Sequence, residues 1–207
     1  MYDPGLIDMV MRLRGRGVSD NAVLRGIELA PRKYFVKPSQ IEQAYAERAL
    51  PIACGQTMNP PMSVALMSQL LELKVDHKLL MVGLGSGYHA AVLSKVVTRV
   101  YAVERYKKLI AQAEKRFNKH DIMNVVIRHG DGRYGWQGQA PFDRILLTCA
   151  LKTAPEGLLK QLAPNGKLVA VVDDKLTVFS KARTKVTERV IMPLSLDMIE
   201  AGKSRTL

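Results

Sequence analysis

The sequence predicts an α/β fold in which a mostly parallel sheet carries helices on both faces. Two observations indicate this class: from residue 78 onward short apolar runs alternate with helical patterns, and the first of these runs ends in a glycine-rich loop. Alternating strands and helices build a parallel sheet, because each helix returns the chain across one face of the sheet. A length of 207 residues is enough for one compact domain with a substantial hydrophobic core.

Seven segments are predicted as the strands of this sheet. They are rich in apolar and β-branched side chains, which favour strands. The segments are residues 78–82, 99–103, 124–128, 142–147, 167–172, 175–179 and 184–192. Little separates the last two, so we expect them to pair at an edge of the sheet, antiparallel at least in part.

Helices are predicted between the strands and before the first one. The spacing of apolar residues indicates helices over residues 88–97, 106–117 and 155–162. Before residue 78 three further helical patterns alternate with proline-rich stretches. Ser19 or Asp20 can cap the second of these, and the third covers residues 61–73. The chain is therefore expected to comprise an N-terminal helical extension with loops, residues 1–77, and a Rossmann-like core, residues 78–207.

The composition predicts a basic surface. The net charge is +12, from 31 Lys and Arg against 19 Asp and Glu, which makes nucleic acid a partner to consider. The basic residues are spread along the chain. The densest stretch, residues 175–189, intersperses them with β-forming residues, as expected for solvent-facing side chains of strands. We therefore expect a solvated surface, and nucleic acid stays an alternative partner.

Membrane spans, disulfides and metal sites are not expected. No apolar run is long enough to cross a bilayer, and the N-terminal residues lack the pattern of a signal peptide, so a cytoplasmic protein is predicted. Cys54 and Cys149 are too few and too far apart for a disulfide framework. No second Cys or His lies at metal-ligand spacing from either of them.

The glycine-rich loop predicts a ligand site at the end of the first strand of the sheet. Gly83, Gly85 and Gly87 follow that strand and lead into a helical pattern. Glycines let the backbone approach a ligand closely, and Rossmann-like folds bind nucleotides here. The spacing differs from the dinucleotide pattern Gly-x-Gly-x-x-Gly, and a Gly-Lys-Ser/Thr phosphate loop is absent. A ligand without phosphates fits better, which points to S-adenosyl-L-methionine.

Two acidic residues extend this site along the same edge of the sheet. Glu104 ends the next strand, about 20 positions after the glycines, where a carboxylate can accept hydrogen bonds from ribose hydroxyls. Asp131 and Gly132 follow the third strand, and an aspartate there can accept from an adenine amino group. Together these positions describe a pocket for an adenosine.

Several short segments give the sequence a family resemblance. They are APRKYFV at residues 30–36, ALPI at 49–52, GQT at 55–57, GSGYHAAVL at 85–93, VER at 103–105, GDG at 130–132, APFD at 140–143 and QL at 161–162. In these segments, their order and their intervals, the chain resembles protein-L-isoaspartate O-methyltransferases over nearly its full length. The resemblance implies a Rossmann-like methyltransferase fold.

The resemblance also implies a reaction. Such enzymes transfer a methyl group from S-adenosyl-L-methionine to the α-carboxylate of an L-isoaspartyl residue in a damaged protein, as the first step of its repair. A carboxylate is already ionised at neutral pH, so no dedicated general base is needed. The enzyme has chiefly to place the two reactants in line and to exclude water.

Roles follow from the resemblance by position. It implies that the cofactor is bound by Gly83, Gly85, Ser86, Gly87, Glu104, Asp131 and Gly132. The loop over the isoaspartyl carboxylate would contain the substrate-binding residues Gln56, Thr57 and Asn59, of which Thr57 and Asn59 are the candidate catalytic residues. His89 stands where the family usually has Gln, and we interpret it as a residue of a helix face.

The chain departs from the family at three positions of the expected site. Met81 replaces an acidic residue two positions before the loop, and Leu84 replaces a small polar residue within it. Asn59 stands near the position of a family serine and is followed by Pro60, which has no N–H to donate. Loss of one charged hydrogen bond weakens binding by roughly 10- to 150-fold.

Three hypotheses follow. The first is the repair methyltransferase itself, acting on proteins or peptides that carry isoaspartyl residues. The second is a divergent relative with weakened or lost cofactor binding and activity, which acts as a binding protein. The third is a methyltransferase of another substrate, such as nucleic acid, which the charge suggests although an aromatic and basic stacking platform is lacking.

Overall fold

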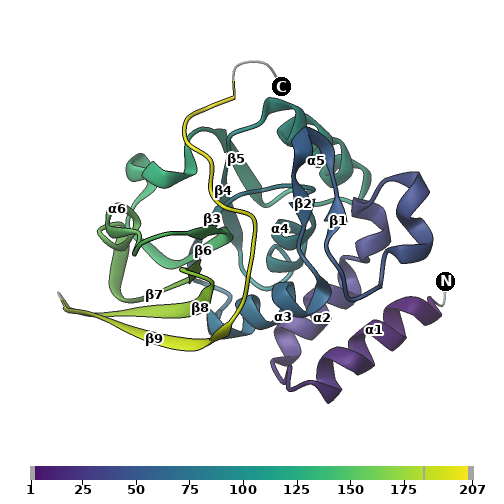
Figure 1. Cartoon of the computed structure of the whole chain (residues 1–207), viewed down its shortest axis with the longest axis horizontal. Coiled ribbons are helices and arrows are strands. Elements are labelled where there is room, and N and C mark those ends of the chain that lie inside the picture. Colours follow the sequence, from purple (N-terminus) through teal and green to yellow (C-terminus); the bar gives the residue numbers. More distant parts are fainter. Residues whose placement is uncertain (1–2, 184, 205–207) are drawn as a thin grey trace.

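The computed structural model describes residues 3–183 and 185–204, which build one seven-stranded sheet with helices around it (Figure 1). The strand order is β5-β4-β3-β6-β7-β8-β9, parallel from β5 to β7 and antiparallel from β7 to β9. The strands are β3 (Lys78–Val82), β4 (Arg99–Glu104), β5 (Val125–His129), β6 (Phe142–Leu151), β7 (Leu162–Val172), β8 (Lys175–Ala182) and β9 (Lys185–Pro193). The predicted fold class, the seven strands and the antiparallel edge pair are confirmed.

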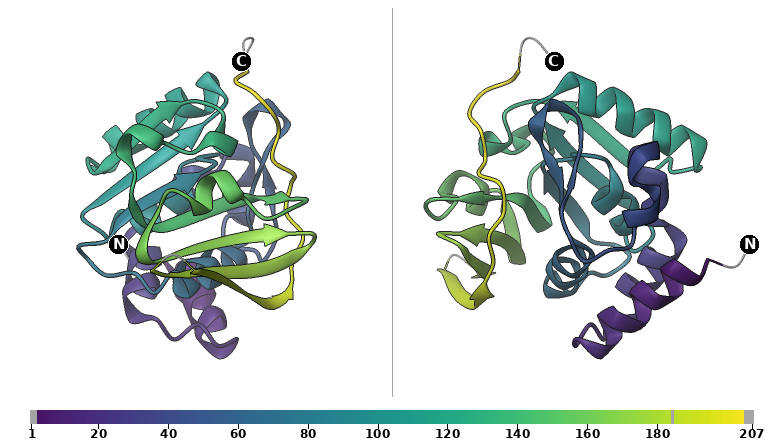
Figure 2. Two further views of the ribbon diagram at one scale, coloured as in Figure 1. Left: turned by 90° about the vertical axis from the view of Figure 1, so that its left-hand side faces the viewer. Right: turned by 45° about the vertical axis from the view of Figure 1, so that its right-hand side comes forward.

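Helices cover both faces of the sheet, but unevenly. One face is packed by five α-helices, namely α1 (Pro4–Gly15), α2 (Asn21–Leu29), α3 (Pro61–Leu70), α4 (Tyr88–Leu93) and α5 (Lys107–Lys119). The other face carries the short helix α6 (Glu156–Leu159) and the 3-10 turns η4 (Gly132–Tyr134) and η5 (Gln137–Gln139). Figure 2 shows the two sets on opposite sides of the sheet. The chain therefore concentrates its packing on the face where the N-terminal helices lie.

The N-terminal helices share their core with the sheet. Met9 of α1, Leu24 of α2 and Met67 of α3 belong to the same buried cluster as Leu79 and Val100 of the sheet. Burial of this apolar surface is the main force that holds these helices against the sheet. The division of the chain at residue 77 into an extension and a core remains our proposal.

The connection from α2 to α3 contains several short elements. It includes η1 (Arg32–Phe35), η2 (Pro38–Gln43), η3 (Ala53–Gly55) and the two-stranded hairpin of β1 (Leu50–Pro51) and β2 (Thr57–Met58). Asp20 is the residue that caps α2, because its carboxylate accepts from the backbone N–H groups of Ala22 and Val23. The sequence had left Ser19 and Asp20 as alternatives.

Several predicted boundaries were wrong. The helix expected over residues 88–97 ends at Leu93. The helix expected over residues 155–162 is only Glu156–Leu159, and β7 begins at Leu162 instead of residue 167. The pairing of β6 with β7 shifts register after Leu162, so the turn-forming residues near Asn165 are an irregularity within the strand. The third N-terminal helix ends at Leu70, before Glu72, whose φ of 48° no longer fits a right-handed helix.

Arg32 ties the irregular connection together from inside. Its side chain is completely buried, and its Nη atoms donate to the carbonyl oxygens of Ala44 (2.7 Å), Arg48 (3.1 Å) and Asn59 (3.1 Å). Burial lowers the pKa of this guanidinium, because it disfavours the charged form. One planar group thus satisfies three carbonyls from two loops, including the one that precedes α3.

We expect Arg32→Met to lower the free energy of unfolding by at least about 3 kcal/mol, because several carbonyls lose their donor in a buried place. Urea unfolding followed by circular dichroism measures this change. Arg25→Met is the matched control, since Arg25 is exposed and pairs with Glu28 one turn away; we expect a change within about 0.5 kcal/mol. Equal effects of the two substitutions would contradict the role given to Arg32.

Candidate active site

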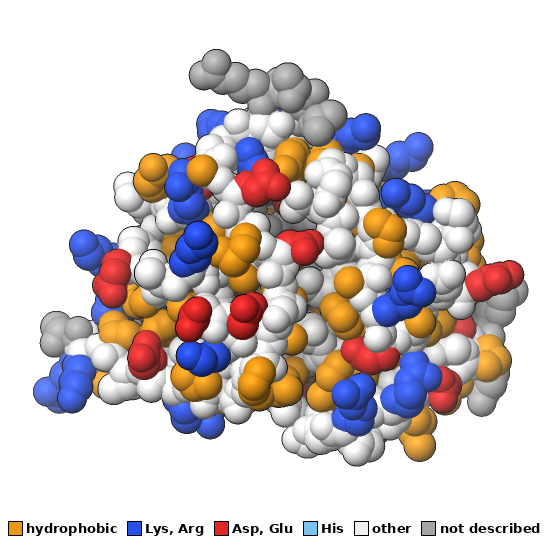
Figure 3. All heavy atoms as spheres, viewed as in Figure 1, with side chains coloured by type: hydrophobic (Ala, Val, Ile, Leu, Met, Phe, Trp, Pro, Cys, Tyr) orange, Lys and Arg blue, Asp and Glu red, His pale blue; other side chains and the backbone are white. Residues whose placement is uncertain are grey.

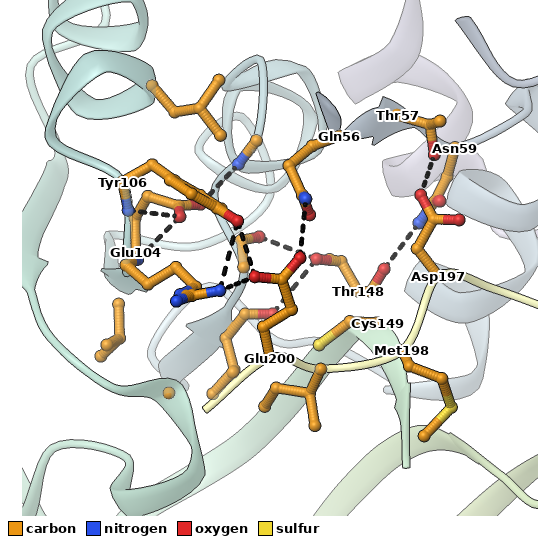
Figure 4. A pocket seen from close by; sticks show the side chains of 18 residues that line it. Gln56, Thr57, Asn59, Glu104, Tyr106, Thr148, Cys149, Asp197, Met198 and Glu200 are labelled. Atoms are coloured by element: carbon orange, nitrogen blue, oxygen red, sulfur yellow. Dashed lines mark hydrogen bonds and ion pairs between the residues drawn. The ribbon is translucent and has the colours of Figure 1, made fainter. Parts of the chain in front are cut away.

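The carboxyl ends of β3, β4 and β6 and the loops that follow them enclose a pocket, which we call the main pocket (Figure 4). Its walls border about 640 Å³ of space, part of which is open to solvent. Parallel strands bring their carboxyl ends to one edge, so loops that are distant in sequence meet there. Of the residues predicted for the site, this pocket is lined by Gln56, Thr57, Asn59, Gly83, Gly85, Glu104 and Gly132.

The glycine loop depends on glycine for both its conformation and its close packing. Gly83, Gly85 and Gly87 all have positive φ, at 88°, 56° and 88°. A Cβ on Gly83 would lie 2.4 Å from Oγ1 of Thr148. That hydroxyl is 2.8 Å from the carbonyl oxygen of Gly83, to which it donates. The loop therefore packs directly against β6 while its backbone faces the pocket.

Glu104 holds this loop in place. Its Oε2 accepts from the N–H groups of Leu84 and Gly85, both at 3.0 Å, and its Oε1 accepts from Arg105 (2.7 Å) and Tyr106 (3.0 Å). The carboxylate thus joins the loop after β3 to the turn after β4. The sequence predicted a ribose acceptor at this position, and the backbone clamp is an additional role that it did not predict.

Gly132 lies in the wall of the main pocket, whereas Asp131 lies outside that pocket. Gly132 lines the main pocket, and a Cβ there would come within 2.4 Å of Val82 Cγ1. Asp131 lies in a neighbouring groove, where its carboxylate accepts from the N–H of Gly202 at 2.8 Å and pairs with Arg133. These hydrogen bonds lower its pKa, although burial acts in the opposite direction. An adenine contact of Asp131 remains a prediction.

Ser86 and Gly87 lie away from the main pocket. Ser86 lines a smaller adjoining cavity of about 330 Å³, and its hydroxyl accepts from the N–H of Tyr88 at 3.2 Å. Gly87 caps α4 and packs against Phe117, so its role in the structure is to turn the chain. Their contacts with a cofactor likewise remain predictions.

The residues expected on the substrate side come from β2 and the residues around it. Thr57 lines both cavities, and its hydroxyl donates to Oδ2 of Asp197 at 2.6 Å. Asn59 donates from Nδ2 to the carbonyl oxygen of Thr148 at 3.0 Å. An amide nitrogen carries two hydrogens, so Asn59 keeps a second donor for another acceptor.

Residues 194–204 cross the main pocket as an extended segment, which we call the strap. Its backbone is attached to β6 by hydrogen bonds from Ala150 N to Asp197 O (2.8 Å) and from Ile199 N to Ala150 O (2.9 Å). The strap adds Asp197, Met198, Ile199 and Glu200 to the lining. Figure 1 shows it running from β9 past the carboxyl ends of the parallel strands. No motif in the sequence indicated this placement.

Charge in the main pocket is predominantly negative. Among the described lining residues the charged side chains are Glu104, Asp197 and Glu200, against the single guanidinium of Arg105. That guanidinium forms an ion pair with Glu200. Phosphates would be repelled by such a lining, whereas the positively charged sulfonium and ammonium of S-adenosyl-L-methionine suit it. Apolar side chains of Val82, Val103, Leu109 and Ile199 complete a surface that fits a nucleoside.

The departures from the family pattern lie beside the smaller cavity. Met81 is buried and, like Leu84, lines that cavity and belongs to the main hydrophobic core. Leu84 reaches Glu104 through its backbone N–H, so the changed side chain leaves that contact intact. Met81 has no strong acceptor to offer, and the weaker cofactor contact remains a prediction.

His89 is a buried neutral imidazole. The Ser68 hydroxyl donates its only hydrogen to Val64 O at 2.7 Å, so the Nε2–H of His89 donates to Ser68 Oγ at 2.9 Å. Burial lowers the pKa of His89 to about 3. The interpretation of His89 as a residue of a helix face is consistent with its place in α4, where the side chain is buried.

Cys149 is an inert thiol at the wall of the main pocket. Burial raises its pKa to about 12, and the charge of Glu104 acts in the same direction. A nucleophilic cysteine needs a lowered pKa, so this position does not supply one. Across residues 3–183 and 185–204, no group of three or more His, Cys, Asp and Glu side chains is arranged to hold a metal ion.

Besides the residues of the strap, the sequence did not predict Arg105, Tyr106 and Thr148 as residues of the site. Arg105 and Tyr106 directly follow the predicted acid, so their position after a strand end was the available signal. Thr148 lies in β6, directly after the strand predicted over residues 142–147, and no sequence pattern marks it.

The basic side chains on the face drawn in Figure 3 are spread over it and do not form one patch. In the described part of the chain, the helices are too short or too polar to span a membrane.

Acid is expected to destabilise the fold through His89. The unfolded state takes up a proton near pH 6.5, whereas the folded state does so only near pH 3, so stability falls as the pH drops between these values. In urea unfolding at pH 7, 6 and 5, the free energy of unfolding of His89→Gln should rise relative to that of the wild type. The rise should be up to about 1.4 kcal/mol for each pH unit below pH 6.5. Carboxylates such as Asp131 titrate in both proteins and cancel. A pH-independent difference would contradict the buried neutral state.

Comparison with known proteins gives one consistent family. The model of the family protein-L-isoaspartate(D-aspartate) O-methyltransferase (PCMT) matches residues 7–196. The protein-L-isoaspartate O-methyltransferase of Maricaulis maris is 45% identical over 209 residues, covering 99% of this chain and 98% of the relative. That of Paramagnetospirillum magneticum is 47% identical over 172 residues, covering 83% and 80%.

Solved structures agree in fold. A protein-L-isoaspartate O-methyltransferase superposes with a TM-score of 0.84 at 24% identity, covering 95% of this chain and 66% of the other. A Plasmodium falciparum protein assigned to the same class, solved in complex with S-adenosyl-L-homocysteine, gives 0.81 at 22% identity, covering 93% and 97%. From the matched length, the identity to its relatives and the shared fold, the chain belongs to the protein-L-isoaspartate O-methyltransferase family.

Proposed function

We propose that this protein transfers a methyl group from S-adenosyl-L-methionine to the carboxylate of L-isoaspartyl residues in damaged proteins or peptides. The observation that carries the proposal is the acidic lining of the pocket where β3 and β4 end, which suits a positively charged nucleoside cofactor. Membership of the methyltransferase family supports the same activity. A cytoplasmic place of action, predicted from the sequence, is part of this proposal.

The residues around the pocket divide between cofactor and substrate. Gly83 and Gly85 would lie along the methionine part of the cofactor, and Glu104 near the ribose. Gly132, with Ile199 of the strap, would border the base. S-adenosyl-L-methionine, when bound, supplies an electrophilic methyl group on a positively charged sulfur.

On the substrate side, Thr57 and Asn59 provide a hydroxyl and an amide that can donate to a carboxylate. Both lie in the wall shared by the main pocket and the smaller cavity. The substrate carboxylate is ionised at neutral pH, so the task of these residues is to orient it and not to remove a proton. The strap lies over the pocket and limits the access of water.

Incubation of the pure protein with methyl-labelled S-adenosyl-L-methionine tests the proposal directly. The acceptors are an isoaspartyl peptide and the same peptide with normal aspartate. We expect base-labile label on the isoaspartyl peptide and none above background on the aspartyl one, because only the former places its carboxylate correctly. No label on either peptide, with an authentic family enzyme active in parallel, would overturn the proposed activity.

The hypothesis of a divergent binding protein is tested in the same preparation. Isothermal calorimetry with S-adenosyl-L-homocysteine measures whether the pocket still binds the cofactor's product despite Met81. Binding together with methyl transfer rejects this hypothesis, and absence of both supports it. Methyl transfer to an oligonucleotide alone would instead support the nucleic-acid hypothesis, for which no basic patch was found on the face drawn in Figure 3.

A further inference from the structure

Two carboxylates of the strap accept hydrogen bonds from side chains on the substrate side of the main pocket. Thr57 Oγ1 donates to Asp197 Oδ2 at 2.6 Å, and Gln56 Nε2 donates to Glu200 Oε1 at 3.3 Å (Figure 4). Tyr106 OH also donates to Glu200, at 2.8 Å. Both residues lie beyond residue 196, where the match to the family model ends. The strap thus places two acidic side chains of this chain in contact with residues expected to receive a substrate.

These carboxylates can be displaced without moving the strap. Asp197 is exposed, and the side chain of Glu200 is 50% exposed, so their hydrogen bonds compete with water and are individually weak. The strap backbone, in contrast, is bonded to β6 on both sides of Met198. A side chain that leaves Thr57 or Gln56 therefore stays beside the pocket. The charge of Asp197 continues to act on whatever is bound there, and that of Glu200 is partly balanced by its ion pair with Arg105.

We propose that Asp197 and Glu200 determine which isoaspartyl segments this protein accepts. This inference rests on the proposed function. The substrate carboxylate has to displace Asp197 from Thr57, and the two acids favour segments with a basic residue beside the isoaspartyl residue over segments with an acidic one.

The overall charge of the chain predicts the opposite preference. A net charge of +12 attracts acidic peptides at long range, whereas Asp197 and Glu200 act at the pocket itself. Exposed charges more than about 10 Å apart are largely screened at 0.1 M salt, so the near acids should dominate under those conditions. The sign of the preference therefore separates the local effect from the global one.

The test compares two isoaspartyl peptides that differ only in having Lys or Glu on either side of the isoaspartyl residue. Fluorescence anisotropy measures the Kd of each labelled peptide in 0.1 M salt with S-adenosyl-L-homocysteine present, so the readout does not require turnover. The proteins are the wild type, Asp197→Asn, Glu200→Gln and the double variant. Asn and Gln keep acceptors for Thr57 and Gln56 and remove the charges, including the charge of Glu200 that pairs with Arg105. Glu188→Gln on the exposed strand β9 is the control.

We expect the wild type to bind the Lys peptide about three- to tenfold more tightly than the Glu peptide. This ratio should fall toward one in the double variant and stay unchanged in Glu188→Gln. A wild type that prefers the Glu peptide, or a double variant that keeps the wild-type ratio, would overturn the inference. If the two acids had only a structural role, their substitution would weaken the binding of both peptides equally. The ratio of the two Kd values would then stay unchanged, which also overturns the inference.

The aspartyl versions of both peptides separate this inference from the proposed function. Equal binding of isoaspartyl and aspartyl peptides by the wild type would contradict the proposed function and, with it, the inference. Preference for the isoaspartyl form, without preference between Lys and Glu neighbours, would contradict the inference alone.

Discussion

The carboxylate of Glu104 is the contact on which the arrangement of the site depends. Its two oxygens accept four backbone N–H groups, two from the glycine loop after β3 and two from the turn after β4. Hydrogen bonds to an ionised group are stronger than neutral ones, and Glu104 is nearly buried, so solvent competes little with them. The glycine loop, with positive φ at three positions, gains from this single residue an anchor to the adjacent strand.

The remaining walls of the pocket come from segments that are more distant in the sequence. They are linked to the glycine loop directly or through one another. Thr148 of β6 packs against Gly83, and Asn59 bonds to the backbone of Thr148. Arg32 holds the carbonyl of Asn59 from inside the N-terminal connection. The strap adds a further wall, which its backbone bonds to Ala150 hold in place. The chemistry we propose needs orientation of the two reactants and exclusion of water, and these walls would serve both.

Much of the fold was predictable because it follows from local patterns. Apolar runs, helical spacing and the glycine loop gave the seven strands, their order along the chain and Glu104 at a strand end. The boundaries of β7 and α6 were predicted wrongly, because the turn-forming Asn165 lies in an irregularity within a strand. The burial of Arg32, the clamp at Glu104 and the carboxylates of Asp197 and Glu200 were not predictable. Each depends on which distant backbone and side-chain groups meet in space, which no spacing in the sequence expresses.

Amide hydrogen exchange measured by NMR tests the central role of Glu104 most directly. The N–H groups of Leu84, Gly85, Arg105 and Tyr106 lie in a loop and a turn, where unbonded amides exchange rapidly. We predict strong protection of all four in the wild type, and loss of protection for at least one pair in Glu104→Gln, in which an NH2 group replaces one oxygen. The amide of Ala170 in the buried strand β7 should stay protected in both proteins. Rapid exchange of the four amides in the wild type, or protection unchanged by the substitution, would contradict the account.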